Sequence, residues 1–89
     1  MDLHLQRIVR RLRSRLPPLR PLPYRRVVRK LMAAGFVEVG QRGSHVKFRK
    51  TTAVGIRQVM VPRHPEVAVG TLRSIIRQAG LTRGDFESP

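Results

Sequence analysis

The chain has no cysteine, few acidic residues and no long uninterrupted run of apolar residues. Without cysteine it can form neither a disulfide framework nor a thiolate zinc site, which is typical of proteins in a reducing cytoplasm. Without a long apolar run it has neither a transmembrane helix nor the hydrophobic segment of a secretory signal, so we expect a cytoplasmic protein with no membrane partner. The acidic residues are scattered, which argues against the clustered carboxylates of a two-metal site. They are Asp2, Glu38, Glu66, Asp85 and Glu87.

Positive charge dominates what is present. The 89 residues include 19 Lys and Arg against 5 Asp and Glu, which gives a formal net charge of +14. Such a charge predicts strong, salt-sensitive binding to phosphate backbones through counterion release, so nucleic acid is the expected partner. A basic structural protein of the ribosome or nucleoid would carry a similar charge. The length leaves room for one small domain.

The beginning of the chain predicts a basic arm that is separate from this domain. Apolar residues recur at helical spacing between arginines over residues 1–16, and repeated proline over residues 17–23 favours an extended linker. We therefore expect an amphipathic arm and Pro-rich linker at 1–21, a domain at 22–86 and a frayed tail at 87–89. The arm could be an extension from an upstream start codon, which we favour, a helix that binds RNA or a partner, or a transit peptide. His4 lies in the arm and is expected to be solvated.

Hydrophobic periodicity predicts two helices and three strands in the domain. Glycines follow both helical patterns where left-handed caps would fall, and Gly43 suits the turn between the first two strands. Both helices must cover the same side of so small a sheet, since only then is one face buried. The expected class is α+β, an α-β-β-β-α sandwich with a three-stranded antiparallel sheet, which is the layout of double-stranded RNA-binding domains. The expected elements are helices over 24–34 and 71–79 and strands over 36–41, 45–49 and 56–61, with a short third helix beginning near Thr82.

The second strand places one histidine among cations. Val46 and Phe48 alternate with His45, Lys47 and Arg49, so burying the first two puts the other three on the opposite face. Histidine can exchange protons near neutrality, whereas Lys and Arg attract and position phosphate. The pattern therefore predicts a basic sheet face, open to water, with one residue capable of proton transfer. Gln58 and Met60 of the third strand are expected to join this face.

Four segments of the domain form a further pattern: Ala34-Gly35-Phe36, Arg42-Gly43-Ser44-His45, Val59-Met60-Val61-Pro62 with His64 after it, and residues 70–81. Together these segments resemble the HicA toxin family. The resemblance covers about residues 22–86 and does not include the arm. It implies an mRNA interferase with a fold like that of double-stranded RNA-binding domains, from a type II toxin–antitoxin system, with a HicB-like antitoxin as partner. In the family the functional histidine follows Gly-Ser, which here is His45; members often have a second histidine or an aromatic residue next, where this chain has Val46.

Cleavage of RNA through its own 2′-hydroxyl needs a base, stabilisation of negative charge and a proton for the leaving oxygen. His45 is the candidate base, because surrounding cations disfavour a charged imidazole and should keep it neutral near pH 7. His64 is an alternative acid, although a solvated role is expected for it. No metal and no small-molecule cofactor are expected, and a serine hydrolase is poorly supported because Ser44 has no visible orienting acid. The candidate RNA-binding residues are Arg42, Ser44, Lys47, Arg49, Arg73 and Arg77.

Three functions thus stay open from the sequence. The first is a metal-independent endoribonuclease that acts on mRNA, with His45 as its catalytic residue. The second is a non-catalytic RNA-binding module in which His45 only stacks on or hydrogen-bonds to the nucleic acid. The third is a basic structural protein, whose binding would depend mainly on its lysines and arginines.

Overall fold

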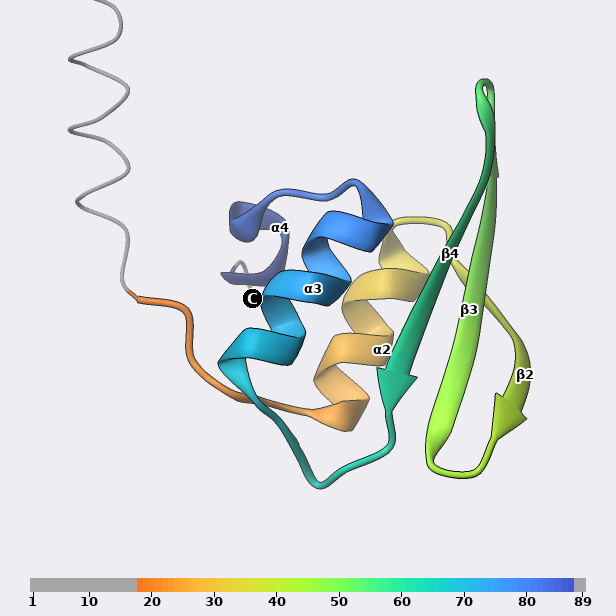
Figure 1. Cartoon of the computed structure of the whole chain (residues 1–89). Coiled ribbons are helices and arrows are strands. Elements are labelled where there is room, and N and C mark those ends of the chain that lie inside the picture. The colour runs from red at the N-terminus through yellow and green to blue at the C-terminus, as the bar shows by residue number, and fades with distance from the viewer. Residues whose placement is uncertain (1–17, 88–89) are drawn as a thin grey trace, which may run out of the picture.

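The computed structural model describes residues 18–87, and Figure 1 shows how their helices and strands are arranged. The helix expected in the arm lies outside the described residues. No described helix has the length and apolar character needed to span a membrane. In chain order the elements are β1 (Leu22–Pro23), α2 (Tyr24–Ala33), β2 (Val37–Arg42), β3 (His45–Thr52), β4 (Gly55–Pro62), β5 (Glu66–Val67), α3 (Val69–Ala79) and α4 (Arg83–Glu87).

The sheet has the predicted three antiparallel strands, in the order β2-β3-β4. Figure 1 shows α2 and α3 on the same side of it, so none of the described helices covers the other face, which we call the open face. The predicted α+β class and α-β-β-β-α order are confirmed. The sequence pattern did not reveal β1 and β5, which pair through Leu22 and Val67 and join the end of the linker to the segment before α3.

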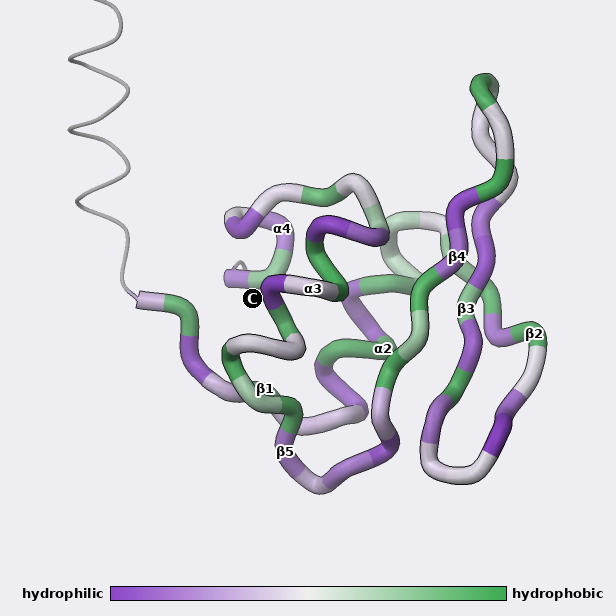
Figure 2. The backbone as a smooth tube through the Cα atoms, viewed as in Figure 1, coloured by the Kyte–Doolittle hydropathy of each residue, from purple (hydrophilic) through white to green (hydrophobic). Residues whose placement is uncertain are grey.

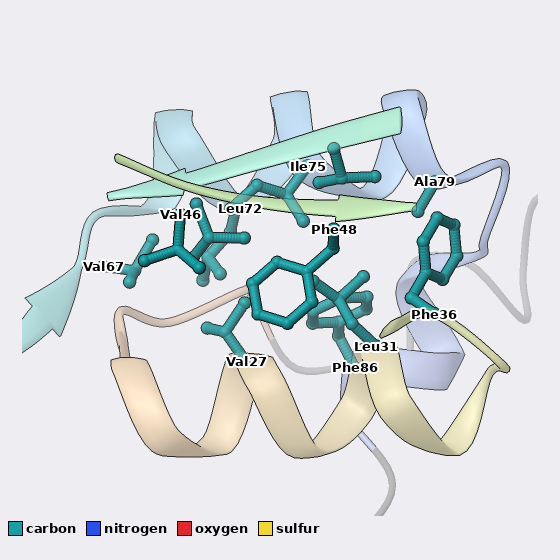
Figure 3. Packing of buried hydrophobic residues seen from close by; sticks show 12 residues of the cluster. Val27, Leu31, Phe36, Val46, Phe48, Val67, Leu72, Ile75, Ala79 and Phe86 are labelled. Carbon is teal, nitrogen blue, oxygen red and sulfur yellow. The ribbon is translucent and has the colours of Figure 1, made fainter. Parts of the chain in front are cut away.

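The core lies between this sheet and the two helices, as Figure 3 shows. Val46 and Phe48 of β3 are buried with Val27 and Leu31 of α2, and Phe86 of α4 belongs to the same cluster. Burying each such side chain contributes roughly 1.5–3 kcal/mol relative to leaving it in water. The remaining members are Phe36, Val59, Val61, Val67, Leu72, Ile75 and Ala79. Leu19, from the expected linker, packs against the same cluster.

Glycines end both long helices, as the sequence predicts. Gly35 has a φ of 96° after α2 and Gly80 has a φ of 67° after α3, a region that residues with a Cβ rarely adopt. The amides that follow donate back into each helix: that of Phe36 to the carbonyl of Leu31 at 3.0 Å, and that of Leu81 to the carbonyl of Ile76 at 3.1 Å. These bonds satisfy carbonyl groups that the last helical turn would leave without partners.

The hairpin of β3 and β4 is longer than the sequence pattern predicts. Pairing continues past the expected end at Arg49 to Thr52 and Gly55, and the tip projects beyond the helices in Figure 1. Figure 2 shows polar and apolar residues alternating along the lower part of the hairpin, where it covers the core. The tip has no core beneath it, so its sequence does not alternate between polar and apolar residues. The backbone hydrogen bonds continue there without that pattern.

The two edges of the sheet differ. The outer edge of β4 is partly covered by α3, because the amide of Met60 donates to Oε1 of Gln78 at 3.4 Å and Arg57 donates to the Gln78 carbonyl at 3.4 Å. On the opposite edge, β2 pairs only with β3, all of its residues are exposed, and a bulge at Val39 interrupts its register. Bulges and exposed charges are ways in which proteins discourage unwanted pairing at a free edge.

Candidate nucleic-acid interface

His45 is exposed and is the first residue of β3. It follows a two-residue turn, Gly43-Ser44, in which Gly43 has a φ of 58° and Ser44 does not have a positive φ. These signs are those of a type II′ turn, which requires glycine at its first central position. The turn pairs His45 with Arg42 of β2, and on its other side His45 is opposite Pro62 of β4. Directly opposed residues share a face, so Arg42 and His45 are neighbours on the open face.

Cations continue along this face from His45. Lys47 is half-buried and lies opposite Met60, while Arg49 is exposed and its guanidinium donates to Oε1 of Gln58 at 3.4 Å. Val46 and Phe48, between them in sequence, are fully buried on the other face. The open face therefore carries His45, Lys47 and Arg49 on one strand, with Gln58 and Met60 beside them.

A hollow of about 250 Å³ lies on this face between β2 and β4. It exists because Gly40 stands opposite Lys47 and has no side chain to fill the space; a Cβ built there would meet nothing within 4 Å. Three of its walls are cationic and the others are mostly apolar or backbone, which suits a phosphodiester with an attached sugar or base. The residues that line it are Val39, Gly40, Gln41, Arg42, Lys47, Arg49 and Met60.

Ser44 holds the turn beside His45 in place through its backbone. Its carbonyl accepts the amide of Arg63 at 2.6 Å, which joins the turn to the segment that follows β4. His64 comes next and is exposed; its amide donates to the Pro62 carbonyl at 2.9 Å. Pro62 is the cross-strand partner of His45, so the topology brings both histidines to the same end of the sheet. From the sequence alone the separation of these histidines was unknown.

Arg63 is a cation at this end that the sequence analysis did not select. Its guanidinium lies over the ring of Tyr24, with 5.7 Å from Cζ to the ring centroid. Burial raises the pKa of the Tyr24 phenol and the negative charge of Glu38 adds to this, while the charge of Arg63 opposes it, so Tyr24 stays protonated as a neutral hydrogen-bonding group. No sequence signal marks Arg63, because its position depends on the hydrogen bond between its amide and the Ser44 carbonyl.

Arg73 and Arg77 are exposed but do not join His45. They lie on α3, which packs through Leu72 and Ile75 on the inner side of the sheet. Gln78 marks the flank of α3 that meets β4, and successive helical residues are about 100° apart, so Arg77 points to a different flank. The structure thus brings Arg42, Ser44, Lys47 and Arg49 together around His45, and it places Arg73 and Arg77 on the helix layer.

No group of three or more His, Cys, Asp or Glu that could hold a metal ion occurs within residues 18–87.

Comparison with known proteins agrees with the resemblance seen in the sequence. The family model described as HicA toxin of bacterial toxin-antitoxin matches residues 24–81, which is more than half of the chain. The match begins at the first residue of α2 and ends just after the glycine that follows α3. No curated protein matches the chain.

Proposed function

The chain belongs to the HicA toxin family of toxin–antitoxin systems, and from this premise we propose that it is a metal-independent endoribonuclease that cleaves mRNA and so inhibits translation. The observation that carries the proposal is the exposed His45 beside Arg42, Lys47 and Arg49 on the open sheet face. Of these residues, only His45 can both accept and donate a proton near neutral pH. Acting on mRNA would place the protein in the cytoplasm.

In the proposed reaction the RNA supplies its own nucleophile. The neutral imidazole of His45 takes the proton of a 2′-hydroxyl, and the 2′-oxygen forms a bond to the adjacent phosphorus. The bond from phosphorus to the 5′-oxygen breaks, and that oxygen receives a proton from solvent or from a second acid. The products are a 2′,3′-cyclic phosphate and a 5′-hydroxyl. His64 is the candidate for the second acid because it lies at the same end of the sheet as His45.

The cations around His45 have two roles in this proposal. Lys47 and Arg49 bind the phosphates on either side of the scissile bond and hold the RNA along β3. Arg42, the direct neighbour of His45, stabilises the negative charge that develops on the phosphoryl oxygens. Because Arg42 is held opposite His45 by the two-residue turn, its guanidinium stays near the reacting phosphate without a large rearrangement.

Membership of the family implies an antitoxin partner, and we take it to be a HicB-like protein. The charge of the open face suggests an acidic partner that covers His45, screens the cations and excludes RNA. Added antitoxin should then stop cleavage and protect the open face from solvent.

Replacement of His45 by alanine tests the proposed role directly. Loss of a general base typically lowers the rate by about two to four orders of magnitude. Cleavage of a labelled mRNA with EDTA present, and growth after induction, are the measurements. The thermal midpoint should not move, since His45 is exposed and has no core contact. His64→Ala, which removes the candidate second acid, is measured in the same assays and should also slow cleavage.

Unchanged cleavage by His45→Ala would exclude His45 as the base. A wild-type protein that binds RNA but yields no products at any concentration would favour the non-catalytic RNA-binding module instead. Cleavage that EDTA abolishes would contradict the metal-independent mechanism.

A further inference from the structure

Helix α2 carries a row of arginines on the side that faces away from the sheet. Arg25, Arg26 and Arg29 are exposed, whereas Val27 and Leu31 are fully buried. Figure 3 shows the buried pair pointing from α2 toward the strands, and helical geometry places the three arginines on the opposite side of the helix. We call Arg25, Arg26 and Arg29 the α2 arginine row. It lies on the far side of the molecule from His45.

The α2 arginine row does not stabilise its own helix. Arg25 and Arg29 are four residues apart and Arg26 and Arg29 are three apart, spacings at which like charges repel. The first turn of α2 contains no acidic residue, and cations there oppose the helix dipole. Within residues 18–87 no ion pair joins a carboxylate to Arg25, Arg26 or Arg29. The row is therefore exposed to solvent and available to the negative charge of a ligand.

A second observation points to nucleic acid as the source of that charge. Arg26 borders a hollow of about 270 Å³ whose apolar walls include Leu19, Leu22 and Phe86. Single-stranded nucleic acid is typically bound by cations that follow its phosphates and by apolar surfaces that receive its bases. The row and the hollow offer both, side by side. The hollow is lined by Pro18, Leu19, Arg20, Leu22, Arg26, Phe86 and Glu87.

We propose that the α2 arginine row is a second RNA-binding surface, which holds a segment of the same RNA that is cut at His45. This inference rests on the proposed function and deepens it. A helix is about 10 Å across and lies about 10 Å from the sheet it covers, so the two surfaces are separated by both layers of the domain. Only an RNA long enough to pass around the molecule reaches both surfaces. The protein therefore prefers long RNA to short oligonucleotides, and the row affects KM more than kcat.

The test compares two RNA lengths in one binding assay. The full-length His45→Ala protein, which does not consume its ligand, is measured with and without the triple change Arg25→Gln, Arg26→Gln and Arg29→Gln. The ligands are single-stranded RNAs of about 6 and about 30 nucleotides, a range that spans a typical single-strand binding site. For the long RNA we expect the triple change to lower the affinity by about tenfold or more. The slope of log affinity against log salt should decrease by about two, the value for three phosphate contacts on a single strand. For the short RNA we expect the affinity to change by about twofold or less.

A charge-preserving variant checks that the loss comes from charge. Arg25→Lys, Arg26→Lys and Arg29→Lys should retain most of the affinity for the long RNA, because each lysine still neutralises a phosphate. Thermal unfolding of each variant shows that the fold is intact, and Arg25→Gln alone provides a milder change if the triple variant does not fold.

Two results would overturn the inference. Equal losses of affinity for the long and the short RNA would mean that the row contributes only to the net charge of the protein. Unchanged RNA affinity together with weaker antitoxin binding would mean that the row is a protein interface. Failure of the proposed function is seen separately, as a lack of cleavage by the wild-type protein. A length-dependent loss in the binding assay would support the second surface even then.

Discussion

The two faces of β3 are built from alternate residues of one short strand, yet they have unlike surroundings. Val46 and Phe48 are fully buried and lie against the helices, while His45 and Arg49 are exposed on the side that no described element covers. Both faces share the same backbone and the same hydrogen-bonded ladder. The difference shows how a domain of this size combines a core with an exposed cationic surface, since alternation lets neighbouring residues belong to each without competing for space.

This comparison implies a clean separation of effects. Changes on the inner face should alter the free energy of unfolding, and with it every activity of the protein. Changes on the open face should alter RNA cleavage or binding and leave the fold intact, because substitutions of exposed residues usually change stability by about 0.5 kcal/mol or less. The following predictions test this separation, from the largest expected effect to the smallest.

Phe48→Ala should destabilise the protein by about 3–5 kcal/mol, the usual cost of removing a large buried aromatic side chain. Urea unfolding followed by circular dichroism measures the change. Arg49→Ala, one residue along on the open face, is the matched control and should change the unfolding free energy by about 0.5 kcal/mol or less. A comparable decrease of the unfolding free energy in both variants would show that both faces contribute to the stability of the fold.

Lys47→Gln combined with Arg49→Gln should lower kcat/KM for RNA about 10- to 100-fold at low salt, as expected if each change removes a phosphate contact worth about 0.7–1.4 kcal/mol. The slope of log affinity against log salt should decrease by about 1.4, that is 0.7 for each lost contact on single-stranded RNA. Binding measured over a range of salt concentrations tests this. An unchanged slope would mean that these side chains do not touch phosphate.

Gly40→Val should weaken RNA binding by about three- to tenfold, because its side chain would fill the hollow opposite Lys47. The fold should tolerate the change, since no atom lies within 4 Å of the added Cβ and valine suits a strand better than glycine. Thr51→Val, on β3, is the control on the same face of the sheet but beyond the hollow. Full affinity in Gly40→Val would show that RNA does not enter the hollow.

The smallest expected effect lies away from both faces, at the start of α4. The carboxylate of Asp85 accepts the amide and the hydroxyl of Thr82 at 2.7 and 2.9 Å, and these bonds hold the pKa of Asp85 below its ordinary value. A lowered folded-state pKa means that Asp85 stabilises α4 above its unfolded-state pKa and loses this effect as the pH falls below about 4.

Thermal midpoints measured between about pH 3 and pH 6 should therefore show a small loss at the acid end that Asp85→Asn removes. RNA cleavage at neutral pH should be the same in both proteins. A change in cleavage would connect α4 to the open face and break the separation described above.

Much of this arrangement could be predicted from local patterns. The alternation around Phe48 predicts which side chains of β3 are buried, and the glycines at 35 and 80 predict where the helices end. Both signals are local: side chains along a strand alternate between its two faces, and a backbone position with positive φ favours glycine. The extension of the β3–β4 hairpin and the pairing of β1 with β5 escaped prediction because backbone ladders can form without a buried face to mark them.

The candidate site was less accessible to sequence analysis. The neighbours of His45 on its own strand follow from periodicity, but Arg63 reaches this end of the sheet only through the pairing of β3 with β4. The same pairing places His64 near His45. Arg73 and Arg77 stay candidate RNA-binding residues, but the packing of α3 puts them on the helix layer, apart from His45. Charge composition alone does not reveal on which surface a charge lies.

The sequence by itself determined the basic character of this protein, the order of its elements and the exposure of His45 on a cationic strand face. These properties depend on composition and on periodicities of two or 3.6 residues, which are written in short stretches of chain. Only the tertiary structure decided that the hollow beside Lys47 exists, that Arg63 and His64 lie at the His45 end of the sheet, and that the arginines of α2 lie on the far side of the domain. Those relations join residues distant in the chain, and they arise when the apolar stripes of the helices and the inner face of the sheet are buried together.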